Sequence, residues 1–403
     1  MKRIYESLVT DHFANNRQMA FLSGPRQVGK TTLAESVLPD AVRLNYDKAA
    51  DARLIAAGAD KVAGFADLSN PMMAKRGILF DELHKFPKWK QFLKGFFDVY
   101  ADKGKLKVAV TGSARMDVYK RGGDSMMGRY FTYRVHPLSI GELGGTDVDL
   151  DEMFRTPQHV SFDDMRALLR FSGYPEPFLK GSERFYNQWK RTRLEKLFAE
   201  DLRDLSRIQD LHGLRSLADL LAARVGGGVN CASLATDLSV SPDTVKSWIA
   251  ILESVYYCWT LSPWFRNVAN SIRKQPKVYL WDWSLVADEG ARNENFVGSH
   301  LLKAVHWWTD SGLGDFGLYY LRTKQQKEVD FLIAKDREPL MLVECKTSPK
   351  EPLSQSLVEF QKSLSVPYAF QVAVDAPSDG IVPAEYKDRA IKISALDLMR
   401  MFA

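Results

Sequence analysis

One stretch near the start of the chain constrains its fold more than any other: Ser23 to Thr32 reads SGPRQVGKTT. It has the spacing GxxxxGK[ST] and lies between a predicted strand over 18–23 and a predicted helix over 31–37. Its two glycines let the backbone curl so that the N–H groups point inward, where they can hold the oxygens of a nucleotide's phosphates. The motif therefore predicts an α/β domain built around a phosphate-binding loop.

Each position of this loop has an expected role. Lys30 would reach the β- and γ-phosphates, and Thr31 would give its hydroxyl to Mg²⁺. The helix that begins there directs the positive end of its dipole at the same anion. The cofactors predicted are ATP and Mg²⁺. The residues expected to bind the nucleotide are Gly24, Pro25, Arg26, Gln27, Val28, Gly29, Lys30, Thr31 and Thr32.

An acidic pair follows the next strongly apolar run, which reads GILFDE over 77–82. A buried strand there would deliver Asp81 and Glu82 to the carboxyl edge of a parallel sheet, where ligands bind. Asp81 would hold Mg²⁺ through water, and Glu82 would orient or deprotonate the attacking water. The pair predicts hydrolysis of the nucleotide, and a solvated acidic strand end is the alternative.

Two further stretches carry candidate residues for the same site. A predicted strand over 106–110 leads into Thr111 and Ser113, which either sense the γ-phosphate or serve an ordinary turn. A glycine-rich loop over 121–130 carries Arg129, which could stabilise the charge of the transition state in its own or a neighbouring subunit. A solvated loop arginine is the alternative for Arg129.

The stretches SGPRQVGKTT, LFDELHKFPKW, TGSAR and GRYFTYRVHPLSIGEL make the chain resemble AAA+-type P-loop ATPases of bacteria and archaea that have a DUF4143-type C-terminal region. The resemblance runs through nearly the whole chain. It implies an ATPase whose sites lie at or near the interfaces of a homo-oligomer, for which a hexameric ring is one arrangement. Thr111 and Ser113 stand where many AAA+ proteins have a sensor asparagine.

The middle of the chain reads as helical. Ser241 and Pro242 are a cap and a first-turn residue for a helix over 243–253, which follows a shorter helix and precedes a strand over 256–261. This order is that of a winged helix-turn-helix, whose second helix can enter a DNA major groove. Because Lys246 is the one basic residue expected on its outward face, DNA contact and subunit packing both stay open.

A second group of charged residues lies near the C-terminus. Predicted strands over 328–334 and 340–347 form a hairpin centred on Arg337, which puts Asp330 opposite Glu344. The period of two in a strand puts Lys346 on the same face as Glu344. Two carboxylates this close favour a hard cation, Mg²⁺ or Mn²⁺, with the lysine placed to stabilise a nucleophile or a developing charge.

Asp330 with Glu344-Cys345-Lys346 resembles the PD-(D/E)XK nuclease signature, and Glu294 on a predicted helix over 293–307 matches an additional acid of that fold. The resemblance implies a metal held by Glu294, Asp330 and Glu344, and catalysis by Asp330, Glu344 and Lys346. The predicted elements follow the order of that fold: helix, three strands, helix, strand. A solvated hairpin with incidental charges and a nuclease-derived fold that binds DNA without cutting it are the alternatives.

Length and composition limit the remaining choices. A chain of 403 residues suggests more than one domain. The predicted parts are an AAA+-type ATPase domain over 1–160, a helical and winged-helix domain over 161–270, and a restriction-endonuclease-like α/β domain over 271–403. Cysteines at 231, 258 and 345 lie too far apart for a zinc site or a disulfide framework, which fits the cytoplasm. No segment reaches a membrane-spanning length, so no membrane partner is expected.

Together these features predict an ATP-hydrolysing AAA+ protein that binds and remodels or processes DNA. Branched, Holliday-junction-like or broken DNA is the expected substrate, held largely by its phosphate backbone. The net charge of +5 favours such an anionic partner only slightly in a chain of this length. The alternative is a nucleotide-gated signalling or defence switch whose C-terminal domain is an effector or a non-catalytic binding module.

Overall fold

The computed structural model describes residues 1–70, 77–101, 106–112, 126–202, 210–265, 275–323 and 325–402. They divide into two units, Met1–His136 with Ser254–Tyr256, and Pro137–Glu253 with Tyr257–Ala403. Apart from Ser254–Tyr256, the residues predicted as separate middle and C-terminal domains fall in the second unit. The three-part division stays a prediction. Among the described residues, no helix is both long and apolar enough to cross a membrane.

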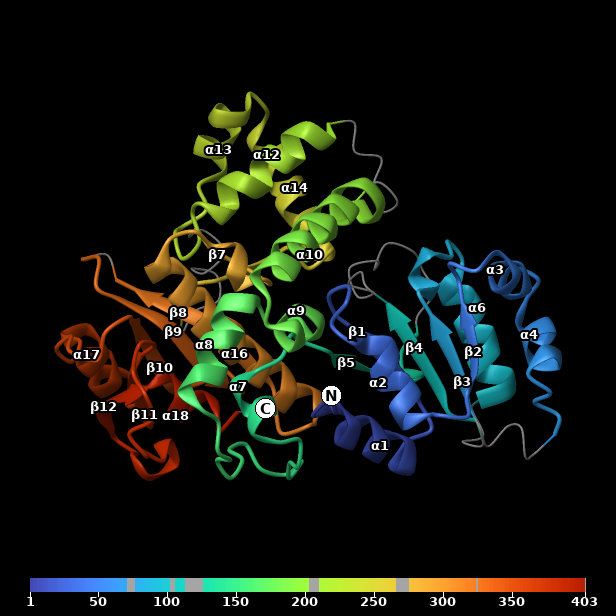
Figure 1. Ribbon diagram of the computed structural model, residues 1–403, viewed down its shortest axis with the longest axis horizontal. Coiled ribbons are helices and arrows are strands. Elements are labelled where there is room, and N and C mark those ends of the chain that lie inside the picture. The colour runs from blue at the N-terminus through green and yellow to red at the C-terminus, as the bar shows by residue number, and fades with distance from the viewer. Residues whose placement is uncertain are drawn as a thin grey trace. The chain divides into compact units, whose positions relative to one another are not determined.

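A five-stranded sheet in the order β2-β3-β4-β1-β5 forms the first unit (Figure 1). All of its pairings are parallel, and they align Ser23 with both Gly112 and Arg134. The central strands are fully buried, as expected of strands covered on both faces. The predicted parallel P-loop sheet is therefore confirmed. The strands are β1 (Met19–Ser23), β2 (Val42–Asn45), β3 (Ile78–Asp81), β4 (Val108–Gly112) and β5 (Tyr130–Arg134).

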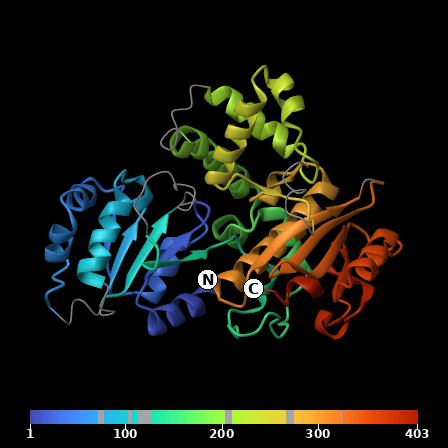
Figure 2. The same cartoon turned by 180° about the vertical axis from the view of Figure 1, so that it is seen from behind.

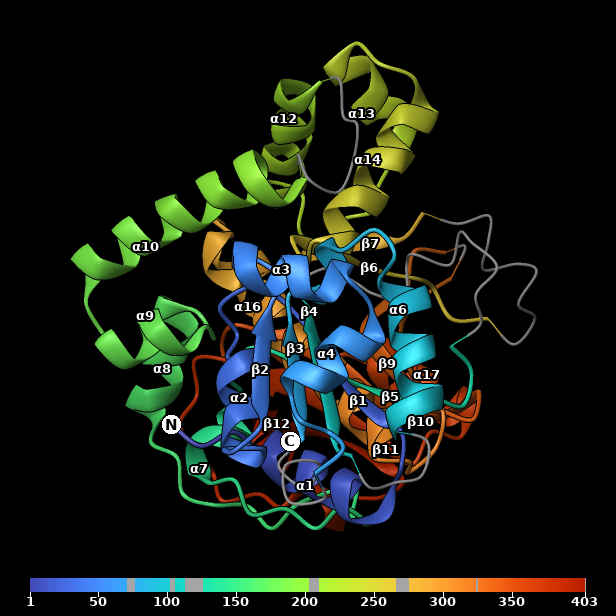
Figure 3. The same ribbon diagram turned by 90° about the vertical axis from the view of Figure 1, so that its right-hand side faces the viewer.

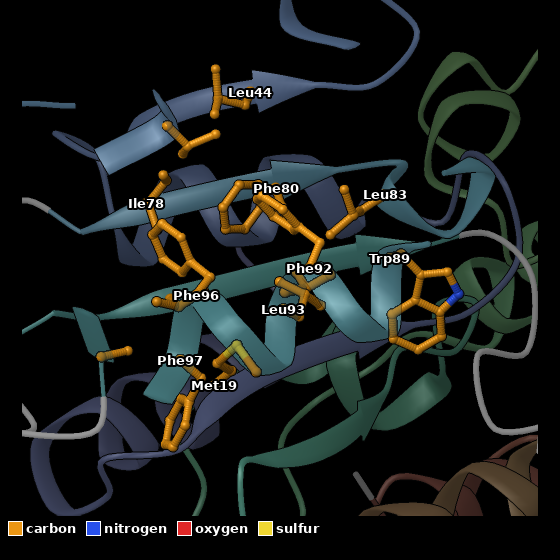
Figure 4. Packing of buried hydrophobic residues seen from close by; sticks show 14 of the residues in the cluster. Met19, Leu44, Ile78, Phe80, Leu83, Trp89, Phe92, Leu93, Phe96 and Phe97 are labelled. Atoms are coloured by element: carbon orange, nitrogen blue, oxygen red, sulfur yellow. The ribbon is translucent and has the colours of Figure 1, made fainter. Parts of the chain in front are cut away.

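Large apolar side chains fill one face of this sheet, against helix α6 (Figure 4). Because side chains alternate across a strand, Met19 and Phe21 of β1 point to this face, with Ile78 and Phe80 of β3. On α6, Phe92 and Phe96 meet the ring of Phe80 edge-on. The helices of this unit are α1 (Tyr5–Asn15), α2 (Lys30–Val37), α3 (Ala49–Ala56), α4 (Ala59–Phe65) and α6 (Trp89–Phe96), which continues into a π-helical turn, η2 (Phe97–Ala101).

A second five-stranded sheet, in the order β12-β11-β10-β9-β8, belongs to the second unit and is seen from behind in Figure 2. Strands β8, β9 and β10 pair antiparallel, whereas β10, β11 and β12 pair parallel. The predicted order of helix, three strands, helix and strand is present, and β12 and α18 follow it. The elements are α16 (Glu289–Asp310), β8 (Phe316–Arg322), β9 (Glu328–Lys335), β10 (Glu338–Lys346), α17 (Gln355–Leu364), β11 (Tyr368–Ala373), β12 (Arg389–Ser394) and α18 (Ala395–Met399).

The β9–β10 hairpin turns more tightly than the sequence suggested. Asp336 and Arg337 both have positive φ, 50° and 71°, as in a two-residue type I′ turn that pairs Lys335 with Glu338. A register shift between Pro339 and Met341 then moves the pairing by one residue. Beyond this shift Val343 pairs with Phe331, the register predicted for a hairpin centred on Arg337. The predicted five-residue turn is wrong, and the predicted register beyond it is confirmed.

Helices α12, α13 and α14 form a further group in the second unit (Figure 3). Helix α14 begins at Pro242 as predicted, and the Ser241 hydroxyl accepts a hydrogen bond from the Thr244 amide, 3.1 Å away. A two-stranded antiparallel sheet of β6 and β7 follows. The elements of this part are α7 (Ile140–Gly144), α8 (Phe162–Phe171), α9 (Pro175–Lys180), α10 (Glu183–Lys196), η3 (Leu197–Asp201), α12 (Leu211–Ala222), α13 (Cys231–Leu238), α14 (Pro242–Ser254), β6 (Cys258–Leu261), β7 (Lys277–Leu280) and η4 (Trp283–Leu285).

Candidate nucleotide site and C-terminal charge cluster

The phosphate-binding loop connects the end of β1 to the start of α2. Gly29 has φ +95°, a left-handed conformation that favours glycine, and it directly precedes the helix. Gly24 lies so close to the residue that follows β5 that a Cβ atom on Gly24 would overlap the main-chain oxygen of Val135. Both glycines of the motif are thus required by the backbone. Pro25 and Val28 of the loop are buried, whereas Gln27 and Thr32 are exposed.

Two buried cations hold this loop in shape. Lys30 Nζ donates hydrogen bonds to the carbonyl oxygens of Gly24, 2.9 Å away, and Pro25, 2.7 Å away. Arg3 donates to the carbonyl of Val28 and, over 2.6 Å, to that of His136. Charge-assisted bonds of this kind are stronger than neutral ones. Arg3 is not predictable from the sequence, because nothing near it in the sequence indicates a link to the loop.

Asp81 is the centre of a polar group at the carboxyl ends of β2, β3 and β4. Its Oδ1 accepts hydrogen bonds from the hydroxyl of Thr31, 3.0 Å away, and from that of Thr111. Its Oδ2 accepts from Arg43 Nη2 at 2.7 Å and Asn45 Nδ2 at 3.2 Å. The residue is 3% exposed. The structure thus brings together Thr31 and Asp81, two hard oxygen donors that fit Mg²⁺.

Glu82 follows Asp81 in a left-handed conformation, with φ +55°. Such backbone strain in a residue other than glycine is concentrated at functional sites. Its Oε2 lies 3.9 Å from His84 Nε2 and 3.8 Å from Lys85 Nζ. Burial, opposed in part by the charge of Glu82, lowers the pKa of His84 to about 4. His84 is therefore neutral at physiological pH, and its Nδ1 has no hydrogen-bond partner among the described residues.

Arg129 lies at the amino ends of the strands, opposite the carboxyl ends where the phosphate loop lies. It immediately precedes β5, whose first residue pairs with Met19, whereas the phosphate loop follows Ser23 at the far end of β1. Its guanidinium forms a two-point ion pair with Asp98, at 2.7 and 2.9 Å. Arg129 is therefore not brought to the phosphate loop of its own chain. Ser113 and residues 121–125 of the glycine-rich loop lie outside the described residues.

The C-terminal charge cluster contains the predicted acids together with a cation, Lys277, that was not predicted from the sequence. Lys277, the first residue of β7, places its Nζ 3.2 Å from Glu294, 2.7 Å from Glu328 and 3.6 Å from Asp330. The Lys277 side chain is 6% exposed. Burial alone would lower its pKa, but the negative charges around it raise the pKa above its ordinary value. The lysine is therefore a permanent cation among these acids.

The remaining predicted residues lie beside this group. Asp330 Oδ2 accepts a hydrogen bond from the amide of Cys345, 2.9 Å away, so the acids of β9 and β10 meet as the register implies. Lys346 donates to Glu344 Oε1 over 3.0 Å, and Glu344 Oε2 is buried without a partner among the described residues. Burial, and then the charge of Asp330, raise the pKa of Glu344 to about 7.

A metal fits this cluster poorly. Within the described ranges, no group of three His, Cys, Asp or Glu side chains is arranged to hold an ion. The charge that would attract a divalent cation to Glu294 and Asp330 is met by the ammonium of Lys277. The implied metal ligation by Glu294, Asp330 and Glu344 therefore does not agree with the residues that surround them.

The fold and the loop define the class of the first unit: it is a P-loop ATPase domain. Residues 16–144 match the family model described as AAA domain. Residues 162–292 and 289–396 match two domains of unknown function, DUF8612 and DUF4143. The chain thus combines a P-loop ATPase domain of the AAA class with a DUF4143 C-terminal region.

Known proteins with similar sequences include Rv2008c of Mycobacterium tuberculosis and Mb2031c of Mycobacterium bovis, both named as uncharacterized proteins. Each is 25% identical to this chain over 342 residues, which is 80% of this chain and 68% of the relative. Among solved structures, the Walker-type ATPase Paby2304 of Pyrococcus abyssi aligns with 70% of this chain and 93% of its own, at 15% identity and a TM-score of 0.42.

Proposed function

We propose that the first unit hydrolyses ATP at the carboxyl edge of its sheet, with Mg²⁺ held by Thr31 and Asp81. The observation that carries this proposal is the 3.0 Å contact between the Thr31 hydroxyl and the Asp81 carboxylate, which joins the phosphate loop to β3. When bound there, Mg²⁺ would neutralise the phosphate oxygens. Lys30 lies under the loop carbonyls, from which its ammonium can turn to the β- and γ-phosphates.

Glu82 is the proposed base or water-orienting residue. Its carboxylate follows Asp81 at the end of β3, and neutral His84 and Lys85 lie within 4 Å of its Oε2. The two consecutive acids contact different groups, Asp81 the hydroxyl of Thr31 and Glu82 the side chains of His84 and Lys85, so one can serve the metal and the other the water. This division of roles predicts that binding and turnover can be separated by mutation.

An ATPase assay with nucleotide-binding measurements tests the proposal. Lys30→Ala should lose both binding and turnover, whereas Glu82→Gln should keep binding and lose turnover by about 100-fold or more, the usual worth of a positioned general base. Glu152→Gln is the matched control, because Glu152 is exposed and lies in the second unit. Full turnover in Glu82→Gln would contradict the assignment.

We further propose that ATP turnover drives binding and remodelling of DNA by the rest of the chain. Helices α13 and α14 joined by a short turn, followed by β6 and β7, support a winged-helix reading. The order α16, β8, β9, β10, α17, β11 supports a nuclease-like C-terminal domain. The proposed partner is branched or broken DNA, contacted through its phosphates by a homo-oligomer, with a hexameric ring as one arrangement.

Measuring ATPase activity with single-stranded, duplex and four-way DNA tests this role, with Lys30→Ala as the control. Stimulation by one form, and binding that weakens steeply as salt is raised, are expected because phosphate contacts release counterions. Undetectable or salt-insensitive binding to every form would count against a DNA function.

A nucleotide-gated switch is the second candidate, and one observation favours it. On the exposed face of α14, Lys246 is paired with Asp243 at 3.2 Å, so this face carries little net positive charge for a DNA backbone. In the switch, ATP would control assembly, and the second unit would bind a protein. Light scattering with and without ATP tests this: an ATP-dependent rise in mass without DNA stimulation would favour the switch.

A further inference from the structure

Lys277 occupies an unusual place for a lysine. It opens β7, a strand whose residues are all buried, and its ammonium contacts carboxylates from two other elements, α16 and β9. Lysines are almost never fully buried unless they are paired. Here one lysine is paired with Glu294, Glu328 and Asp330 together, which is the surrounding that a divalent cation would otherwise require.

We propose that the Lys277 ammonium takes the place of the divalent cation expected at Glu294 and Asp330, so that the C-terminal module acts without a metal and does not cut DNA. This inference refines the proposed function, because it rests on the proposed DNA role of the same region. It also makes a separate claim about this chain's own residues: the cation beside these acids is a lysine of the same chain.

The hydrogen bonds of the acids support this arrangement. Glu294 Oε1 accepts from Lys277 and from the hydroxyl of Tyr279, 2.6 Å away. Its Oε2 lies beneath Gly226, where an added Cβ would be 2.9 Å from that oxygen. Asp330 Oδ1 forms an ion pair with Lys277 at 3.6 Å, and Asp330 Oδ2 accepts a hydrogen bond from the amide of Cys345. Each carboxylate oxygen of Glu294 and Asp330 therefore already contacts a donor or a cation, or lies close to the backbone of Gly226.

The outer acids are also engaged. Glu328 pairs with Lys277 through Oε1 and with Arg322 through Oε2, 3.3 Å away. Glu344 pairs with Lys346 through Oε1, which leaves its Oε2 as the one oxygen of these two residues without a partner among the described residues. A metal needs several such oxygens at once. It would also have to lie beside the ammonium, which repels it.

Replacing Lys277 should turn the cluster into a metal site. Lys277→Met keeps an unbranched apolar side chain, one atom shorter, and removes the charge. We expect it to bind Mn²⁺, the probe, at least tenfold more tightly than the unchanged chain in calorimetric titrations without nucleotide. Adding Asp330→Asn should abolish the gain. Bound Tb³⁺ should luminesce on excitation of Tyr279 and of Trp259, whose ring stacks on Tyr279 at 4.5 Å.

Lys303→Met is the matched control. Lys303 is also a buried lysine of the second unit, 2% exposed, but it pairs with the single carboxylate of Glu142. This variant should lose stability without gaining Mn²⁺ binding. Equal Mn²⁺ affinity in Lys277→Met and the unchanged chain would overturn the proposal.

A second comparison keeps the test decisive if Lys277→Met does not fold. The unchanged chain and its Asp330→Asn variant should bind Mn²⁺ equally, and neither should cut plasmid or four-way DNA with Mg²⁺ or Mn²⁺. Mn²⁺ binding or metal-dependent cleavage that disappears in Asp330→Asn would overturn the proposal. Failure of the DNA role would appear separately, as absent DNA binding with the Mn²⁺ results unchanged.

Discussion

Glu344 should make the stability of the second unit depend on pH near neutrality. Its residue is 8% exposed, one of its oxygens has no partner among the described residues, and Asp330 lies close by. Burial and this neighbouring charge raise its pKa to about 7 from the ordinary value of 4.5. The folded protein therefore holds a proton on Glu344 at pH values where the unfolded chain has released it.

The sign and size follow from proton linkage. A folded-state pKa above the unfolded value gives stability that is fully present below the unfolded pKa and is lost as pH rises through the folded pKa. With pKa values of 4.5 and about 7, raising the pH from about 5.5 to about 8.5 should lower the free energy of unfolding by about 2 kcal/mol. Glu344→Gln removes the titrating group and should lose this part of the pH dependence.

Urea unfolding followed by tryptophan fluorescence measures the effect. The chain has nine tryptophans, and Trp89 is the only one in Met1–His136, so the signal reports mainly on the second unit. As the pH rises through that range, the free energy of unfolding of Glu344→Gln should increase by about 2 kcal/mol relative to that of the unchanged chain. Glu338→Gln, an exposed change on the same strand, is the control. Parallel pH curves for Glu344→Gln and the unchanged chain would refute the reasoning.

Three further outcomes follow from the structure. Gly24→Ala should weaken ATP binding at least tenfold in fluorescence titrations, because the added Cβ would overlap the main-chain oxygen of Val135. Gly95→Ala is the control and should leave ATP affinity unchanged, because no heavy atom lies within 4 Å of its added Cβ. Arg129→Ala should keep ATP affinity. If ATP turnover, measured over a series of protein concentrations, is lost only where the protein assembles, Arg129 acts on the nucleotide of a neighbouring subunit. Lys303→Met should destabilise the second unit by about 3–5 kcal/mol in urea unfolding, because the buried carboxylate of Glu142 would lose the ammonium beside it.

The C-terminal hairpin shows what local sequence can predict. The register of Asp330 and Glu344 follows from the period of two and from the length of the turn region, and the structure keeps it. The predicted five-residue turn was wrong, because the chain turns tightly at Asp336 and Arg337 and the register shift at Pro339 compensates for the shorter turn. Proline lacks an N–H for the ladder and is found at such irregularities, so the signal was present in the sequence.

Lys277 shows what local sequence cannot predict. Its partners lie on α16 and β9, whereas Lys277 itself begins a strand of a different, two-stranded sheet. Only the packing of these elements brings the charges together. A lysine that opens the apolar strand KVYL does predict a buried acidic partner, but not which acid. For the same reason the sequence did not reveal Arg3 beneath the phosphate loop or Arg43 beside Asp81.

Arg129 is an intermediate case. Its position directly before a strand was visible in the sequence, and in a parallel sheet that position is the amino edge, away from the phosphate loop. Sequence alone did not give the direction of β5 relative to β1. The pairing of these two strands therefore narrows the role of Arg129 to contacts outside its own nucleotide site, such as those with a neighbouring subunit.

The two acidic sites differ in how their charge is balanced, and this difference predicts where a metal acts. Asp81 is balanced by Arg43, whose side chain is 37% exposed, so the guanidinium can turn to water when Mg²⁺ takes over the charge of Asp81. Lys277 is 6% exposed, and moving it away would remove the cation that lies beside Glu294 and Asp330, at about 3–5 kcal/mol. Mg²⁺ can therefore displace the counter-ion at Asp81 but not at Asp330, so adding Mg²⁺ with ATP should change hydrogen exchange around β3 and leave β9 unchanged.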